Sequence, residues 1–203
     1  MEKAYLNKSL VLLGGFKPVN FDKLFLVKSG LVQEGDFQDD SVFLPDYAQI
    51  STPRFLIHVN PDRVNIGYKD PSSVLDGSKV SRLFSDSTVK ALGVNFKKAL
   101  ILDRKSRTKD FFYFEENILN QHFDDVDTVY GYFASREFPD YRLTLNIKPV
   151  KLQRVDDPKV YDALDFSFNF RFGGDNALTG VNRVSELEEI ANLIIEDYDR
   201  VDG

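Results

Sequence analysis

The chain has 203 residues, a formal net charge of −6 and no cysteine. The lack of cysteine excludes disulfides, thiolate zinc sites, iron–sulfur clusters and a cysteine nucleophile. The excess of acidic residues argues against nucleic acid as a partner, because phosphate recognition needs clustered cations.

The first predicted elements are a strand and a short helix. An apolar run at 10–13, closed by two glycines, predicts a buried strand. Asn20 is a candidate N-cap for a helix over 21–29, which Gly30 ends. The apolar run is too short for a signal peptide, and no window approaches the ~18 apolar residues of a membrane span. We therefore expect a cytoplasmic protein with no membrane contact.

A hairpin and a second helix follow. Apolar side chains alternate over 55–68, on both sides of a turn at 60–62, and predict two paired strands. A broken helical stripe over 78–92 leads into a strand over 94–102. The order strand, helix, strand, strand, helix, strand is the connectivity of a ferredoxin-like βαββαβ unit. We expect such a lobe over residues 1–103.

The second half begins with a stretch that can be interpreted in two ways. The basic segment from Arg104 to Lys109 is either a solvated loop tip or a contact for nucleic acid or another anion. Residues 111–123 predict a helix with Asp110 as its N-cap, but the four consecutive aromatics at 111–114 are also compatible with a strand. Both alternatives stay open at this point.

Three strands are predicted next, over 129–135, 141–150 and 164–172. In the third, phenylalanine alternates with polar side chains, which is typical of a strand with one buried and one wet face. An amphipathic helix over 184–201 closes the chain, with an apolar stripe opposite a very acidic side. We expect this stripe to pack on the phenylalanine face.

The start of this last helix carries a helix-capping pattern. Ser185 and Glu188 have the spacing of a capping box. In this motif the serine side chain accepts a hydrogen bond from the backbone N–H of the glutamate, and the glutamate side chain accepts one from the backbone N–H of the serine. We therefore expect the Glu188 side chain to turn back toward the start of the helix.

These elements define the predicted fold class. We expect an α+β protein with two abutting lobes of antiparallel sheet and helices on one face. The N-terminal lobe over 1–103 is ferredoxin-like, and the C-terminal lobe over 104–203 has three antiparallel strands and a long C-terminal helix. No Pro-, Gly- or Ser-rich linker separates the lobes, so we expect residues 1–203 to form a single compact unit.

Three motifs carry a family resemblance: KSLVLLGGFKPVNF, TPRFLIHVNPDRVNI and VKALGVNF. In this order and spacing, between Lys8 and Phe96, the chain resembles a group of bacterial proteins of about 200 residues that has no assigned activity. The resemblance implies a bacterial, stand-alone α+β protein and brings no catalytic residues. It implies structural roles for Asp62, Arg63, Gly93 and Asn95, such as a salt bridge in a turn and the start of a strand.

Few residues are candidates for catalysis or metal binding. His58 and His122 are the only histidines, and each is either a general base or, as is commoner, a packed or capping residue. The acidic clusters at 36–40 and 124–127 lack the spacing of an EF-hand and are typical of solvated loops. The glycine pairs lack the pattern of a P-loop or a GxGxxG motif. The sequence therefore predicts no metal and no cofactor.

A polar sheet face is the best candidate for a binding site. The polar positions of the strand over 164–172 are expected to align with those of the strand before it, in an otherwise acidic protein. Tyr130 and Tyr132 are expected to contribute from the strand over 129–135. Arginine is enriched at interface hot spots, although many antiparallel sheets simply keep one wet face. The predicted binding residues are Arg142, Thr144, Asn146, Lys148, Asn169 and Arg171.

Two functions from different classes follow. The first is a non-enzymatic interaction module of a bacterial intracellular system, which binds a protein partner, either another protein or a second copy, through this polar face. The alternative is an enzyme or a small-ligand-binding protein with a pocket between the two lobes. A concave site with convergent polar groups would favour the alternative.

Overall fold

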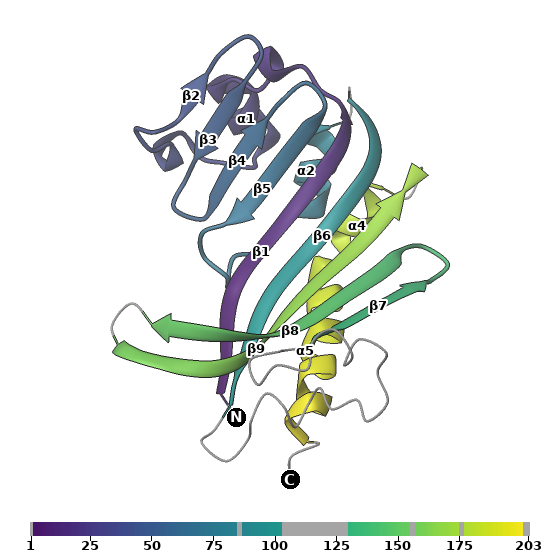
Figure 1. The fold of residues 1–203 in the computed structure, drawn as a ribbon. Helices are drawn as coiled ribbons and strands as arrows, with labels where there is room; N and C mark the ends of the chain where they lie inside the picture. The colour runs from purple at the N-terminus through teal and green to yellow at the C-terminus, as the bar shows by residue number, and fades with distance from the viewer. Residues whose placement is uncertain (1, 85–86, 103–129, 155–156, 175–176, 201–203) are drawn as a thin grey trace.

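The computed structural model describes residues 2–84, 87–102, 130–154, 157–174 and 177–200. Nine strands form one antiparallel sheet in the order β2-β3-β4-β5-β1-β6-β9-β8-β7 (Figure 1). The strands are β1 (Glu2–Gly15), β2 (Val42–Phe43), β3 (Ala48–Ser51), β4 (Phe55–Val59), β5 (Arg63–Tyr68), β6 (Thr88–Ile101), β7 (Tyr132–Glu137), β8 (Arg142–Arg154) and β9 (Asp157–Gly173).

The helices lie on one side of this sheet. They are α1 (Lys23–Ser29), α2 (Gly77–Leu83), α4 (Thr179–Asn182) and α5 (Val184–Arg200), with short 3₁₀ turns at Pro18–Asn20 and Glu34–Asp36. We call the side that they pack against the covered face; its strands present Phe96, Phe168 and Phe170. The opposite side, which presents Asn95 and Asn169, is called the open face. Among the described residues, no helix combines the length and the apolar character that a membrane crossing requires.

The predicted fold class is wrong, because the two halves of the chain share one sheet. β6 pairs with β1 along nearly all of both strands and with β9 from Ala91 to Ile101. β1 and β6 are each 14 residues long, far longer than the apolar run at 10–13 indicates. The N-terminal part is therefore not a separate ferredoxin-like lobe. It continues without interruption into the C-terminal strands.

The helix predicted over 78–92 is also wrong in its second half. α2 ends at Leu83, and β6 begins at Thr88. Leu92 lies in β6 and is buried on the covered face with Val94 and Phe96. A helical stripe and an alternating strand share some apolar spacings, so the sequence does not separate the two elements.

The phenylalanines of β9 form the centre of the core. The four at 166, 168, 170 and 172 are at most 2% exposed, which confirms the predicted alternation. Phe168 stacks on Phe166 and on Phe170, with ring centroids 6.3 and 6.5 Å apart and interplanar angles of 11°. α5 buries Leu187, Ala191 and Ile195 against the same core. Burial of these rings and aliphatic chains holds α5 on the sheet.

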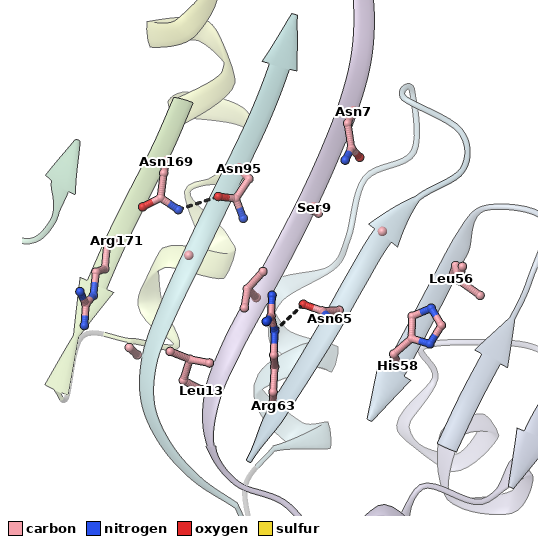
Figure 2. Close-up of a pocket in the computed structure, with 14 residues that line it drawn as sticks. Asn7, Ser9, Leu13, Leu56, His58, Arg63, Asn65, Asn95, Asn169 and Arg171 are labelled. Carbon is pink, nitrogen blue, oxygen red and sulfur yellow. Dashed lines mark hydrogen bonds between the residues drawn. The ribbon is translucent and has the colours of Figure 1, made fainter. Parts of the chain in front are cut away.

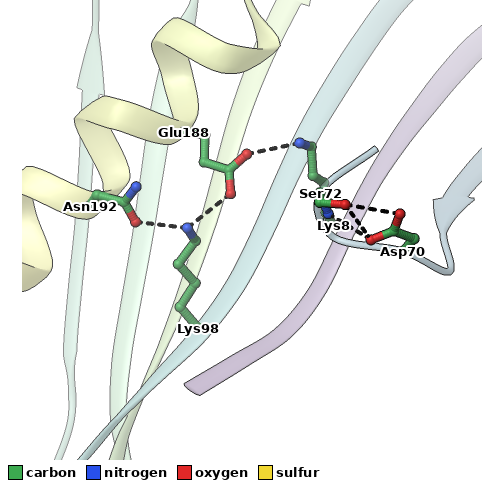
Figure 3. A network of polar contacts seen from close by, with 6 residues as sticks. All are labelled: Lys8, Asp70, Ser72, Lys98, Glu188 and Asn192. Carbon is green, nitrogen blue, oxygen red and sulfur yellow. Dashed lines mark hydrogen bonds and ion pairs between the residues drawn. The ribbon is translucent and has the colours of Figure 1, made fainter. Parts of the chain in front are cut away.

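A small ionic cluster lies between α5 and the sheet (Figure 3). Lys8 Nζ donates to Glu188 Oε2 at 2.8 Å, and Lys98 Nζ donates to Glu188 Oε1 at 3.0 Å and to Asn192 Oδ1 at 2.7 Å. Both lysines are buried. Burial alone would raise the pKa of Glu188, but the hydrogen bonds from the two lysines outweigh it and hold this pKa below its usual range. Glu188 therefore contacts the sheet, and the predicted capping role is wrong.

Several predicted features lie outside the described residues. They are the basic segment from Arg104 to Lys109, the helix or strand over 111–123, its cap Asp110, His122 and the acidic cluster at 124–127.

Candidate binding face

Strand pairing aligns polar side chains in rows across the open face. One row contains Thr144, Asn169, Asn95, Ser9 and Gly67, which are direct neighbours on β8, β9, β6, β1 and β5. Asparagine is disfavoured in strands, so amides at such positions are not explained by strand propensity.

The next row, two residues further along each strand, carries charge at one side. It contains Arg142, Arg171, Gly93, Val11 and Asn65 in the same strand order. The register places glycine and small or apolar residues in the middle of the face and long polar residues on both sides. This gives the open face a depression.

We call this depression the sheet hollow, and its volume is about 670 Å³ (Figure 2). Glycine helps to form it in two different ways. A Cβ at Gly93 would lie 3.2 Å from Asn169 Nδ2, so the close approach of that amide favours glycine. A Cβ at Gly67 would make only an ordinary contact, 3.7 Å from the Leu56 carbonyl oxygen, and would fill open space. The lining residues are Asn7, Ser9, Val11, Leu13, Leu56, His58, Arg63, Asn65, Gly67, Ala91, Gly93, Asn95, Asn169 and Arg171.

An amide pair stands on one wall of the sheet hollow. Asn169 Nδ2 donates to Asn95 Oδ1 at 2.5 Å, and Figure 2 shows the two side chains side by side on β9 and β6. This bond uses one donor of Asn169 and one acceptor of Asn95, so Asn169 Oδ1 and Asn95 Nδ2 keep hydrogen-bonding capacity. Such a pair offers both a donor and an acceptor to a bound group.

Two arginines rise from opposite sides of the sheet hollow (Figure 2). Arg63 Nε donates to Asn65 Oδ1 at 3.1 Å, and this side chain has no carboxylate partner among the described residues. Arg171 is exposed and has neither an ion pair nor a hydrogen bond within the described part of the chain. An unpaired guanidinium presents a fork of N–H donors that suits a carboxylate.

Three further cations of the open face are paired with carboxylates. Arg142 Nε lies 3.4 Å from Glu137 Oε1 and donates to Ser135 Oγ at 2.8 Å. Lys148 and Lys97 lie 3.9 and 3.4 Å from the buried carboxylate of Asp165. Among the three predicted cations, Arg171 is thus the one whose charge is not already matched by a described residue.

The structure places all six predicted residues on the open face, on the neighbouring strands β8 and β9. Arg142 is opposite Arg171, and Thr144 is opposite Asn169. Only Asn169 and Arg171 line the sheet hollow. Thr144 and Asn146 line a smaller depression of about 370 Å³ beside it, which we call the second hollow. Lys148 lines neither of these two depressions.

The opposite wall of the sheet hollow was not predicted from the sequence to be a binding site, although His58 and Arg63 were named for other roles. Arg63 and Asn65 come from β5, and His58 comes from the neighbouring strand β4. Their alternation with Val64 and Ile66 was visible in the sequence, but strand order was not. The resemblance implied a salt bridge in the turn at Asp62 and Arg63; in the described residues Arg63 bonds Asn65 instead.

His58 is the one histidine among the described residues. Its Nδ1 lies 2.8 Å from the Tyr47 hydroxyl, which lies 3.0 Å from Gln49 Oε1. The Tyr47 hydroxyl has one proton, and when it donates this proton to Gln49 it can only accept a hydrogen bond from His58 Nδ1–H. In that tautomer of the neutral His58 ring, Nε2 is the acceptor. No group of three or more metal-ligating side chains occurs in the part of the chain that the structure describes.

Comparison with known proteins adds no identity to this geometry. No model of a protein family matches the chain, and no curated protein matches it either. The resemblance to a bacterial group therefore depends on the three quoted motifs alone, and two residues to which it assigned structural roles, Gly93 and Asn95, line the sheet hollow.

Proposed function

We propose that the protein is a binding protein whose sheet hollow accepts an acidic segment of a protein partner. One observation carries this proposal: Arg63 and Arg171 flank a concave, amide-lined surface without any acidic partner among the described residues. The chain as a whole has a net charge of −6, so its own acidic groups are plentiful. Two unmatched guanidiniums in such a chain provide charge complementarity to an anionic partner.

The width of the sheet hollow supports an extended peptide. β1 and β6 lie between the strands that carry Arg63 and Arg171, and the two arginines are offset by two residues along the strands. Three strand spacings of about 14 Å and an offset of about 7 Å place the two Cα atoms about 16 Å apart. A single extended chain fits between walls at this separation, because a strand needs only about 5 Å of lateral room beside its neighbour. The amides of Asn95 and Asn169 are suited to the main-chain N–H and C=O groups that such a segment carries.

A small anionic ligand is the competing occupant. A volume of about 670 Å³ lies within the range of small-molecule sites, roughly 300–1,000 Å³. The earlier alternative of a pocket between two lobes loses its basis, because the sheet hollow lies on one continuous sheet. The lining of the sheet hollow follows β1 from Asn7 to Leu13, and this elongated lining favours a chain segment over a compact small molecule.

The proposal is tested by fluorescence anisotropy with labelled octapeptides of Gly, Ser and Thr that carry two central glutamates. We expect wild-type protein to bind this peptide about tenfold more tightly than its glutamine analogue, and to lose affinity as salt rises from 50 to 300 mM. Arg171→Glu should abolish the difference between the two peptides. The matched control is Arg82→Glu, a charge reversal at an exposed arginine of α2, on the other side of the sheet.

Two results would contradict the proposal. One is equal binding of the glutamate and glutamine peptides by wild-type protein. The other is the same loss of affinity in Arg82→Glu as in Arg171→Glu, since that would reflect net charge alone. A competition experiment with citrate distinguishes the small-anion occupant. That occupant is favoured if citrate displaces the peptide and chloride of equal ionic strength does not.

A further inference from the structure

We infer that the bound segment is bipartite, with an acidic group at Arg171 and an apolar side chain on Phe133, about five residues apart. This inference rests on the proposed function and specifies the partner's chemistry. It follows from a second depression that continues the first, and from an exposed aromatic ring at its far end.

The two depressions are continuous. Asn7, Asn95 and Asn169 line both the sheet hollow and the second hollow. The combined surface therefore crosses the open face from the arginines on β5 and β9 to Phe133 on β7. A segment that begins at one end can reach the other without leaving a concave surface.

Phe133 is unusual among the exposed residues. Its side chain is 71% exposed, and it is the one aromatic ring among the large apolar side chains that are exposed in the described residues. It pairs with Asn146 of β8, which places it on the open face, whereas its neighbour Tyr132 pairs with the buried Ile147 and packs against the core. An aromatic side chain at the end of a polar groove is a typical anchor for an apolar group of a partner.

Strand pairing fixes the separation of the two anchors. Arg171 is opposite Arg142, and Phe133 is opposite Asn146, four residues further along β8. Two strand spacings of about 10 Å in total, combined with four residues of about 13 Å, give about 16 Å between the anchors. An extended chain covers that distance with about five residues.

Polar groups suited to a peptide main chain lie along this path. Asn169 and Thr144 are paired across β9 and β8, between the two anchors, and Asn146 lies beside Phe133. Asn169 donates to Asn95 and keeps its carbonyl oxygen for a bound N–H group. The order along the path is thus cation, amides, aromatic ring, which fits a segment with an acidic residue, a polar spacer and an apolar residue.

The test is a spacing scan with labelled peptides of Gly, Ser and Thr that contain one glutamate and one leucine. Their separation is varied from one to eight residues, in both chain orders, and a peptide with glutamate alone is the reference. We expect separations of four to six residues in one of the two orders to bind about tenfold more tightly than the reference, because burial of an apolar side chain is worth about that factor.

The variant Phe133→Ser should remove this gain and leave binding of the glutamate-only peptide unchanged. Val160→Ser is the matched control, since Val160 is an exposed apolar residue of β9 that lines neither depression. The inference is overturned if leucine gives no gain at any spacing, or if the gain survives in Phe133→Ser. In both cases binding of the glutamate-only peptide, still sensitive to Arg171→Glu, would leave the proposed function standing. A failure of every glutamate peptide to bind would overturn both.

Discussion

On the covered face of the sheet, Lys8 and Lys98 are buried and matched by Glu188, whereas on the open face Arg63 and Arg171 have no acidic partner among the described residues. Lys8 and Lys98 share Glu188 beneath α5. The same strands carry both arrangements, since Ser9 and Asn95 face the opposite way from Lys8 and Phe96. A strand residue and its neighbour therefore lie in different environments, one buried under α5 and one on the open face that we propose for recognition.

The comparison shows where the free energy of folding resides. Burial of apolar area and pairing of desolvated charges stabilise the covered face, so side chains there are sensitive to truncation. The open face keeps unmatched donors in contact with water, where their removal costs little. The predictions below use matched substitutions on the two faces, from the largest expected effect to the smallest.

The largest effect is expected for Phe168→Ala. Phe168 is 2% exposed and stacks between two other rings, so truncation leaves a cavity and should lower the free energy of unfolding by roughly 3–5 kcal/mol. The matched change Phe133→Ala on the open face should cost less than about 1 kcal/mol. Urea denaturation of both variants checks the comparison. Similar losses in the two variants would contradict it.

Removal of the shared carboxylate is expected to have the next largest effect. Glu188→Ala leaves the buried ammonium groups of Lys8 and Lys98 without their anion, which in buried pairs costs roughly 3–5 kcal/mol. Lys8 also lies 4.6 Å from the centroid of the Tyr68 ring, a contact that offsets part of the loss. We therefore expect about 2–3 kcal/mol by urea denaturation. Glu189→Ala, at the exposed neighbouring position, should change stability by about 0.5 kcal/mol or less.

The same carboxylate predicts a pH dependence. The pKa of Glu188 is lowered in the folded protein relative to the unfolded chain, where a glutamate titrates near ~4.3. Its contribution to stability is thus fully present above that value and is lost as the pH falls through the folded pKa. The stabilities of wild type and Glu188→Gln in urea unfolding should differ most near pH 7, and the difference should begin to shrink as the pH falls below about 4. A difference that stays constant down to pH 3 would show that ionisation of Glu188 does not stabilise the fold.

The sequence predicted local strand faces well and their arrangement poorly. The alternation of phenylalanine in β9 identified the buried side of that strand, because a period of two has only two possible assignments. Strand order depends on long-range pairing between β1, β5 and β6, which leaves no local pattern. The division into two lobes failed for this reason.

Only part of the candidate site was predicted, because local patterns were readable and long-range strand pairing was not. Arg142, Asn169 and Arg171 lie on strands that are consecutive in the chain, so their alignment follows from a hairpin. Arg63 reaches the same surface only because β1 and β6 join β5 to β9 in one sheet, and this pairing is long-range. Lys148 and Asp165 are direct partners in the same β8–β9 hairpin, so their pairing could have been inferred in the same way, but it was not predicted.

The smallest and sharpest comparison is between two glycines, one on each face. A Cβ at Gly180 in α4 would lie 2.6 Å from Cδ2 of the buried Phe172 ring, so Gly180→Ala should force a shift and cost about 1 kcal/mol or more. A Cβ at Gly67 meets nothing closer than 3.7 Å, so Gly67→Ala should raise the free energy of unfolding by about 0.5 kcal/mol, because glycine in a strand is entropically unfavourable. Thermal denaturation of both variants should shift the melting temperature in opposite directions. The added methyl group of Gly67→Ala also enters the sheet hollow, so the same variant should bind the glutamate peptide more weakly while it is more stable. A variant that is destabilised, or that binds with unchanged affinity, would mean that the floor of the sheet hollow is filled by the fold itself rather than left open for a partner.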